Sequence, residues 1–288
     1  MPAQAFALLA AVGFATSSVA AKRGLQTASV PAGVLIDLTA GTLILAVLVA
    51  IDRPGAVEMP GALVFVAAGL VAPGMSRWAS TTGFARLGPT IAVPILAGMR
   101  PVLSAIGAIL FLGEAVRAGR VAGLALVIAG GWFLSRAPAQ RDGPAVFRPA
   151  VAWPVLAALC FATSDVIVKQ ILDSVPTPTV GALLAACGAL LFWGFTAAVA
   201  PPVRRSLRFG SQAPWMVLSG ALVGLAIASL FTALDGGEVT VVIPILASQP
   251  LLVVGLSWLL LRRIEILTPG KVAGAAAVVA GTILVSVG

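Results

Sequence analysis

Residues Phe14–Lys22 read FATSSVAAK, and residues Phe161–Lys169 read FATSDVIVK, 147 positions later. Two further pairs follow in the same order: PILA at Pro94–Ala97 and Pro244–Ala247, offset by 150, and GRVAG and GKVAG at Gly119–Gly123 and Gly270–Gly274, offset by 151. Three ordered matches at almost one offset indicate a tandem duplication. We therefore expect each half of the chain to fold as a copy of the same unit.

The composition predicts that these units lie in a membrane. Of the 288 residues, 60% are hydrophobic and 10% are charged, whereas an average soluble domain carries about 25% charged residues. A spanning helix needs about 20 apolar residues. Ten stretches meet this need approximately and predict an all-α membrane protein with ten transmembrane helices: 3–21, 32–51, 61–84, 89–113, 118–135, 151–171, 179–200, 213–234, 239–261 and 269–287.

Five predicted spans fall in each half, which we place at residues 1–138 and 151–288, joined by a polar linker at 139–150. Because five is odd, the second copy must cross the membrane in the opposite sense. Inverted repeats are typical of alternating-access transporters, which hold their substrate near the midplane between the repeats.

Several classes of function are excluded by what the chain lacks. It has no histidine and no tyrosine, so histidine metal sites and histidine-dependent catalysis are ruled out. The two cysteines lie in apolar runs and are interpreted as small buried side chains. The basic residues are scattered at the ends of apolar runs and form no stripe that would bind nucleic acid. We expect no enzyme, no cofactor and no metal.

The stretch Gly83–Gly131 resembles one half of an EamA-type member of the drug/metabolite transporter superfamily. The resemblance is carried by Pro101 in mid-span, by Leu112-Gly113-Glu114 at the end of that span, and by Gly130 near the end of the next span. The second half matches through Pro250, Gly274 and Gly281, and departs from the pattern at the Gly-Glu position, which we place at Arg262-Arg263.

The resemblance implies a ten-helix exporter in the bacterial cytoplasmic membrane that moves amino acids or other small metabolites. Among such proteins, the chain looks most like the YddG-type aromatic amino acid exporters. The terminal orientation is left open, because the family resemblance implies cytoplasmic termini whereas the charge distribution favours the opposite. Of the 18 basic residues, 13 lie toward the face opposite the termini.

Arg100 stands about halfway along the fourth span. An arginine at the bilayer centre costs roughly 2.5–3.5 kcal/mol even on lenient scales, so its side chain should face the bundle interior. Two interpretations are open: Arg100 pairs with a carboxylate or with carbonyls freed by Pro101, or its guanidinium binds the carboxylate of a substrate. Gln249 is its counterpart in the second half. We expect these two residues to hold the polar end of a substrate, and the following residues to line its pocket: Phe14, Thr16, Ser17, Trp78, Met99, Phe161, Thr163 and Ser164.

Asp165, Lys169 and Asp173 follow at a spacing of four residues on one helical face. They either neutralise one another locally or make Asp165 a site for ion or proton coupling. The first span has Ser18 in place of Asp165 and no carboxylate, which argues against proton-coupled cation export.

Two further sets of residues have expected structural roles. Pro94, Pro101, Pro244 and Pro250 are the expected hinges, because each proline removes a backbone hydrogen bond. The small-residue motifs Gly119/Gly123 and Gly270/Gly274 should pack one repeat on the other, so we expect a monomer.

Near the membrane edge, we expect Glu114 to form an interfacial ion pair with Arg117 and Arg120. Asp235 and Glu238 flank two glycines and are expected in an exposed turn.

The leading prediction is an exporter of small metabolites, with amino acids that carry aromatic or apolar side chains as first candidates. A lipophilic-cation or drug exporter is the alternative, and it should depend on a buried carboxylate such as Asp165. A membrane scaffold or lipid-handling protein that transports nothing is a more remote alternative.

Overall fold

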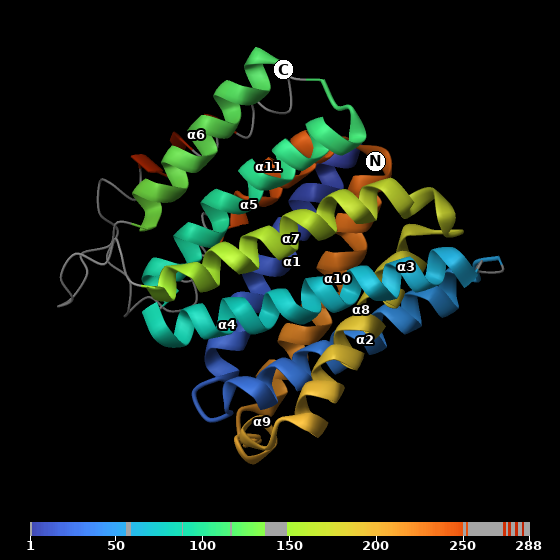
Figure 1. The fold of residues 1–288 in the computed structure, drawn as a ribbon, viewed down its shortest axis with the longest axis vertical. Helices are drawn as coiled ribbons and strands as arrows, with labels where there is room; N and C mark the ends of the chain where they lie inside the picture. The colour runs from blue at the N-terminus through green and yellow to red at the C-terminus, as the bar shows by residue number, and fades with distance from the viewer. Residues whose placement is uncertain are drawn as a thin grey trace. The chain divides into compact units, whose positions relative to one another are not determined.

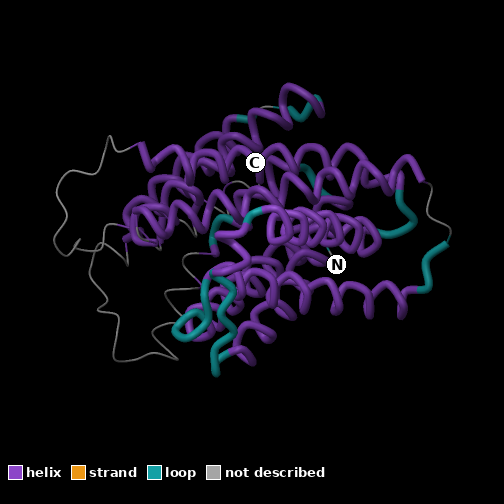
Figure 2. Tube along the Cα trace, turned by 60° about the horizontal axis from the view of Figure 1, so that its bottom comes forward, coloured by secondary structure: helices purple, strands orange, loops and turns teal. Residues whose placement is uncertain are grey.

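The computed structural model describes residues 2–55, 59–87, 89–115, 117–135 and 149–249, and beyond them residues 252, 273–274, 276–277, 280–281 and 284. Within these residues the regular structure is helical throughout, with no strand, which confirms the predicted all-α class. Figure 2 shows helices joined by short loops.

The helices, labelled in Figure 1, have the following bounds: α1 Ala3–Gly24, α2 Val30–Asp52, α3 Met59–Gly69, η1 Leu70–Met75, α4 Ser76–Leu87, α5 Pro89–Leu112, α6 Ala118–Ser135, η2 Pro149–Val151, α7 Ala152–Ile171, η3 Leu172–Ser174, α8 Pro178–Val199, α9 Pro201–Arg205, α10 Ala213–Gly236 and α11 Val239–Leu246. Helices α2, α8 and α10 each have a proline at one of their first two positions. A proline is suited to these positions because the amide it lacks would have no partner within the helix.

Six helical segments are long and apolar enough to cross a membrane: Ala3–Ala21, Val30–Asp52, Met59–Ser80, Ala152–Ser174, Pro178–Val199 and Ala213–Gly236. Two shorter apolar helices cover Gly98–Leu112 and Ala118–Gly130. Large apolar side chains such as Leu43, Phe111 and Phe195 are more than 60% exposed, as expected for a chain whose solvent is lipid. The count of ten spans stays a prediction, because the last two stretches lie largely outside the described residues.

The third predicted span is interrupted rather than continuous. Between α3 and α4 the backbone leaves the helical region at Ala72, with φ −144° and ψ 126°, and a cis peptide bond joins Ala72 to Pro73. A proline has no amide hydrogen to continue the helix, and it disfavours helical angles in the residue before it. Pro73 was not among the predicted hinges, although its effect on the preceding residue was readable from the chain.

The chain folds into two compact units, and each takes helices from both halves of the sequence. The first unit comprises Met1–Met75 and Ile167–Gly237, and the second comprises Ser76–Val166 and Glu238–Gly288. The unit boundaries fall between η1 and α4, within α7, and between α10 and α11. The boundaries of the two repeats are a separate matter and stay a prediction.

Small residues bring the helices of the first unit close together. A Cβ atom added at Gly224 of α10 would lie 2.6 Å from the carbonyl oxygen of Gly41 on α2. An added Cβ at Gly69, at the end of α3, would collide with the backbone of Ala185 on α8. In a bilayer the helices gain no hydrophobic energy from meeting one another, so backbone approach at small residues supplies the packing.

A buried carboxylate lies on the contact between α2 and α10. Ser219 is 1% exposed, and its hydroxyl donates to Oδ1 of Asp37 at 2.5 Å. Asp37 itself is 3% exposed. Arg23 stacks on the ring of Trp215, with its guanidinium carbon 4.6 Å from the ring centroid. Ser219, a polar partner of Asp37, thus belongs to α10, the helix whose Gly220 and Gly224 approach the backbone of α2.

Replacing Gly224 by alanine should destabilise the first unit, because the new methyl group would push α2 away from α10. We expect a loss of about 1–3 kcal/mol, measured as a lower midpoint of thermal unfolding in detergent. Gly194 is the matched control, since no atom lies within 4 Å of its would-be Cβ. Gly194→Ala should leave the midpoint unchanged or raise it, and equal midpoints for the two variants would refute the packing argument.

Candidate functional site

An ion pair within the second unit joins α5 to α7, the two helices labelled in Figure 1. Nε of Arg100 donates to Oδ2 of Asp165 at 3.0 Å, and Nη2 donates to Oδ1 at 2.7 Å. The side chains are 19% and 5% exposed. The two parallel bonds are the bidentate geometry that makes an arginine–carboxylate pair strong and directional.

Ser104 completes the set of donors around this carboxylate. Its buried hydroxyl donates to Oδ2 of Asp165 at 2.8 Å. Ser104 lies one helical turn after Arg100, so both side chains leave α5 on the same face and reach α7 together. Close approach is possible because Gly107, one turn further, has no side chain: a Cβ there would lie 2.8 Å from Val166 of α7.

An aromatic ring lies against the cation of the pair. The guanidinium carbon of Arg100 is 4.8 Å from the ring centroid of Phe161, which precedes Asp165 by one turn of α7. The electron-rich face of the ring attracts a cation at this distance. The site therefore brings together one cation, one anion, one hydroxyl and one aromatic face.

The pair is neutral as a whole, but it is expensive to bury. Desolvation of two charges in a low-dielectric interior can exceed their mutual attraction, so a buried pair is weak evidence for stability. Ionisable side chains inside a membrane are rare and mark pathways for substrates or ions. The pair is therefore a candidate functional site.

The structure corrects the local pairing considered for Asp165 and Lys169. Asp165 is bound by Arg100, whereas Nζ of Lys169 donates to the carbonyl oxygens of Leu234 at 2.6 Å and Asp235 at 3.3 Å. Carbonyl groups in the last turn of a helix lack partners within that helix and attract a cation. The end of α10 thus binds Lys169, a contact that spacing along α7 does not reveal.

Of the pocket residues predicted from the sequence, Arg100 and Phe161 are brought together by the structure. Among the other predicted residues of the second unit, Trp78 contacts a different partner. For the rest, the structure gives the degree of burial. Trp78 is 42% exposed, and its ring packs edge-on against that of Trp153, with the two ring centroids 5.0 Å apart. Ser164 is buried, Met99 and Gln249 are half-buried, and Thr163 is exposed. Ser104 was missed, although its spacing of four residues from Arg100 was a usable signal.

The remaining predicted pocket residues belong to the first unit. Phe14, Thr16 and Ser17 lie on α1. The hydroxyl of Thr16 donates to the carbonyl oxygen of Val12 at 2.8 Å, and that of Ser17 donates to the carbonyl oxygen of Phe14 at 2.9 Å. Both hydroxyls are therefore satisfied within their own helix. Their part in a pocket stays a prediction.

The expected hinges and packing residues are described only in part. Pro101 is buried within α5, which runs unbroken through it, and Pro244 is buried within α11. Pro94 lies in α5 but its side chain falls outside the described part of the chain, as do Pro250 and Gly270.

Gly119 and Gly123 lie on α6, and Gly123 and Gly274 are buried. A Cβ at Gly281 would lie 2.6 Å from the carbonyl oxygen of Gly123. Segments of both sequence halves therefore meet closely within the second unit.

Comparison with known proteins bears on the family and the fold. The comparison with curated proteins finds no match. A solved structure described as "Crystal structure of protein" shares 17% identity with a TM-score of 0.80, over 99% of this chain and 96% of that chain. At this identity the likeness shows a shared fold. The profile of the EamA-like transporter family matches residues 1–136 and again residues 148–287. Because the two matches span nearly the whole sequence, the chain belongs to the EamA-like transporter family and contains its domain twice.

Proposed function

We propose that this membrane transporter exports amino acids with aromatic or apolar side chains, by alternating access between its two repeats. The family membership supports transport of small molecules by a multi-pass membrane protein. The observation that carries the choice of substrate is the paired Arg100 and Asp165, with Phe161 against the cation.

The charges of this pair match those of an amino acid. A free amino acid carries a carboxylate and an ammonium group on one carbon. Its carboxylate would take the guanidinium fork of Arg100, and its ammonium group would take the carboxylate of Asp165. Each protein charge then exchanges one partner for another of the same sign, and neither is left buried and alone. Ser104 would keep its bond to Asp165 throughout this exchange.

The apolar surroundings support a side chain of aromatic or apolar character. Phe161 is at the site, and Met99 directly precedes Arg100 on α5. The neutral amide of Gln249 completes the lining that we propose within the second unit. The resemblance to YddG-type exporters supports the same substrate class. We place the protein in the bacterial cytoplasmic membrane as a monomer.

The main alternative, export of a lipophilic cation, agrees less well with the geometry. Such a cation would have to displace Arg100 from Asp165, because the carboxylate already accepts two bonds from the guanidinium and one from Ser104. The displaced guanidinium would then remain in the interior without an anion. Removing one partner of a buried pair typically costs about 3–5 kcal/mol.

Replacing both charges of the pair tests their role in transport. The double variant Arg100→Gln/Asp165→Asn leaves no unpaired charge, so it should fold with a normal thermal midpoint. It should lose at least roughly a hundredfold in uptake of radiolabelled phenylalanine, tryptophan or methionine into proteoliposomes, since about 2.7 kcal/mol corresponds to that factor. Arg100→Lys should also fail, because an ammonium group cannot form the bidentate fork.

Arg205→Gln is the matched control, since this arginine is exposed at the end of α9. Normal uptake is expected for it. A folded double variant that still carries phenylalanine at the native rate would exclude the pair as the binding site.

Analogues that lack one charge separate the two candidate substrate classes. Competition against radiolabelled phenylalanine should be strong for unlabelled phenylalanine and at least about tenfold weaker for phenethylamine, which lacks the carboxylate, and for phenylpropionate, which lacks the ammonium group. The reason is that either analogue leaves one buried charge without its partner. If phenethylamine or tetraphenylphosphonium is carried and phenylalanine is not, the cation-exporter alternative holds instead.

A further inference from the structure

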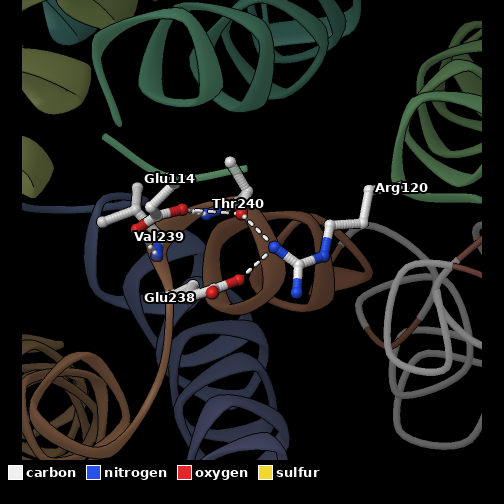
Figure 3. A network of polar contacts seen from close by, with 5 residues as sticks. All are labelled: Glu114, Arg120, Glu238, Val239 and Thr240. Carbon is white, nitrogen blue, oxygen red and sulfur yellow. Dashed lines mark hydrogen bonds and ion pairs between the residues drawn. The ribbon is translucent and has the colours of Figure 1, made fainter. Parts of the chain in front are cut away.

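A second charged network in the second unit joins the turn between α5 and α6 to the start of α11 (Figure 3). The carboxylate of Glu114 accepts three hydrogen bonds there. The backbone amides of Val239 and Thr240 donate at 2.7 Å and 2.9 Å, and the hydroxyl of Thr240 donates at 2.6 Å. None of these residues belongs to the Arg100 site.

This carboxylate serves as the cap of a helix that has none of its own. The first amides of any helix lack partners within it, and a carboxylate near them is favoured by both hydrogen bonding and the helix dipole. Glu238 stands at the capping position of α11, but its side chain makes no capping bond. The cap comes instead from Glu114, 125 residues earlier in the chain.

Arg120 of α6 also bonds to residues at the start of α11. Its Nη1 donates to the carboxylate of Glu238 and, at 3.2 Å, to the hydroxyl oxygen of Thr240. That hydroxyl thus accepts from Arg120 while it donates to Glu114, as Figure 3 shows. The side chain of Arg120 is 13% exposed and that of Glu238 is 45% exposed, so the network lies between the interior and the surface.

These contacts add to two expectations. Glu114 was expected in an interfacial ion pair, and in the structure its carboxylate caps α11. Glu238 was expected in an exposed turn, and its side chain, 45% exposed between α10 and α11, pairs with Arg120. Gly113 makes the first contact possible. It ends α5 with φ +67°, a conformation that costs glycine little, and it thereby turns the chain at the residue before Glu114.

Three residues of the network have a chemically similar counterpart in the other copy of the repeat, whereas Glu238 aligns with Gly88. The offset of 151 that relates Gly119 to Gly270 also aligns Glu114 with Glu265 and Arg120 with Lys271, and the offset of 150 aligns Thr240 with Thr90. The second half therefore keeps the carboxylate of the Gly-Glu pair and loses only the glycine, contrary to the placement at Arg262-Arg263. Glu265 and Lys271 lie outside the described residues, so the recurrence is an observation on the sequence alone.

We propose that Glu114, Arg120, Glu238 and Thr240 form a latch that holds α11 in one state of the transport cycle and releases it in the other. The bonds run between side chains and the free end of α11, so they can break and be replaced by water without unfolding that helix. Helix α11 has only eight residues, contains Pro244, and leads to Ser248 and Gln249. Alternating access requires contacts that exist in one state and are absent in the other. The proposal rests on the alternating access proposed above and is independent of the substrate.

The test measures how fast single cysteines along α11 react with a water-soluble maleimide, and it needs no substrate. The background lacks Cys160 and Cys187. One reporter cysteine replaces Val241 in the first turn of α11, and another replaces Ser248, a residue beyond the last turn that is 6% exposed. Glu114→Ala should accelerate labelling at both positions by about tenfold, the factor that about 1.4 kcal/mol produces. Arg120→Gln should act in the same direction and provides a second variant if the first fails to fold.

The two reporters separate a latch from a local cap. A cap that only prevents fraying would affect Val241→Cys and leave Ser248→Cys unchanged, and this result would overturn the proposal. Asp52→Ala is the matched control, because it removes a similar bond between helix ends in the first unit, where the hydroxyl of Thr179 donates to Asp52 at 2.7 Å. Labelling at Val241 and Ser248 should not respond to it. An equal response to Asp52→Ala would also refute the latch.

Discussion

In a bilayer the backbone has no water to bond, so each buried amide and carbonyl must find its partner within the chain. This constraint accounts for the helices and also for what happens where they end or break. At the end of α10 the unmatched carbonyl groups are bound by Lys169, and at the start of α11 the unmatched amides are bound by Glu114. In both places a charged side chain from a distant part of the sequence supplies the missing partner. These two helix ends of the described chain thus depend on long-range polar contacts.

The charges of the pair between α5 and α7 obey a related constraint. A single buried charge is far more costly than a pair, so Arg100 and Asp165 form an ion pair with no net charge. Ser104 holds the carboxylate of this pair by a hydrogen bond, and the ring face of Phe161 contacts its guanidinium. A binding partner that keeps the total charge of the site at zero is favoured over one that changes it. Net charge, more than size, is therefore the first property by which this site would select a substrate.

The architecture was predictable from the sequence because its signals are local or periodic. Apolar length marked most of the spans, and the recurrence of FATS, PILA and the GxVAG motif revealed the two copies that the family profile also matches. The mid-span position of Arg100 showed that it should face the interior. Its partner was harder to identify, because Asp165 lies 65 residues away and a nearer cation, Lys169, offered a plausible local pair. The cap on α11 had no local signal either, since it depends on which helix end the α5–α6 turn approaches.

The division of the chain into two units has a consequence for how the protein is made. Helices α1 to α3 enter the membrane first, but their glycine-rich faces pack on α8 and α10, and these helices are not complete until residue 236 has been synthesised. At a synthesis rate of about 5–20 residues per second, the early helices wait on the order of ten seconds for their partners. During that interval the backbone around Gly41 and Gly69 is covered by lipid or by the insertion machinery. The first repeat therefore cannot complete its own packing as an autonomous domain, and the order of insertion becomes part of the folding pathway.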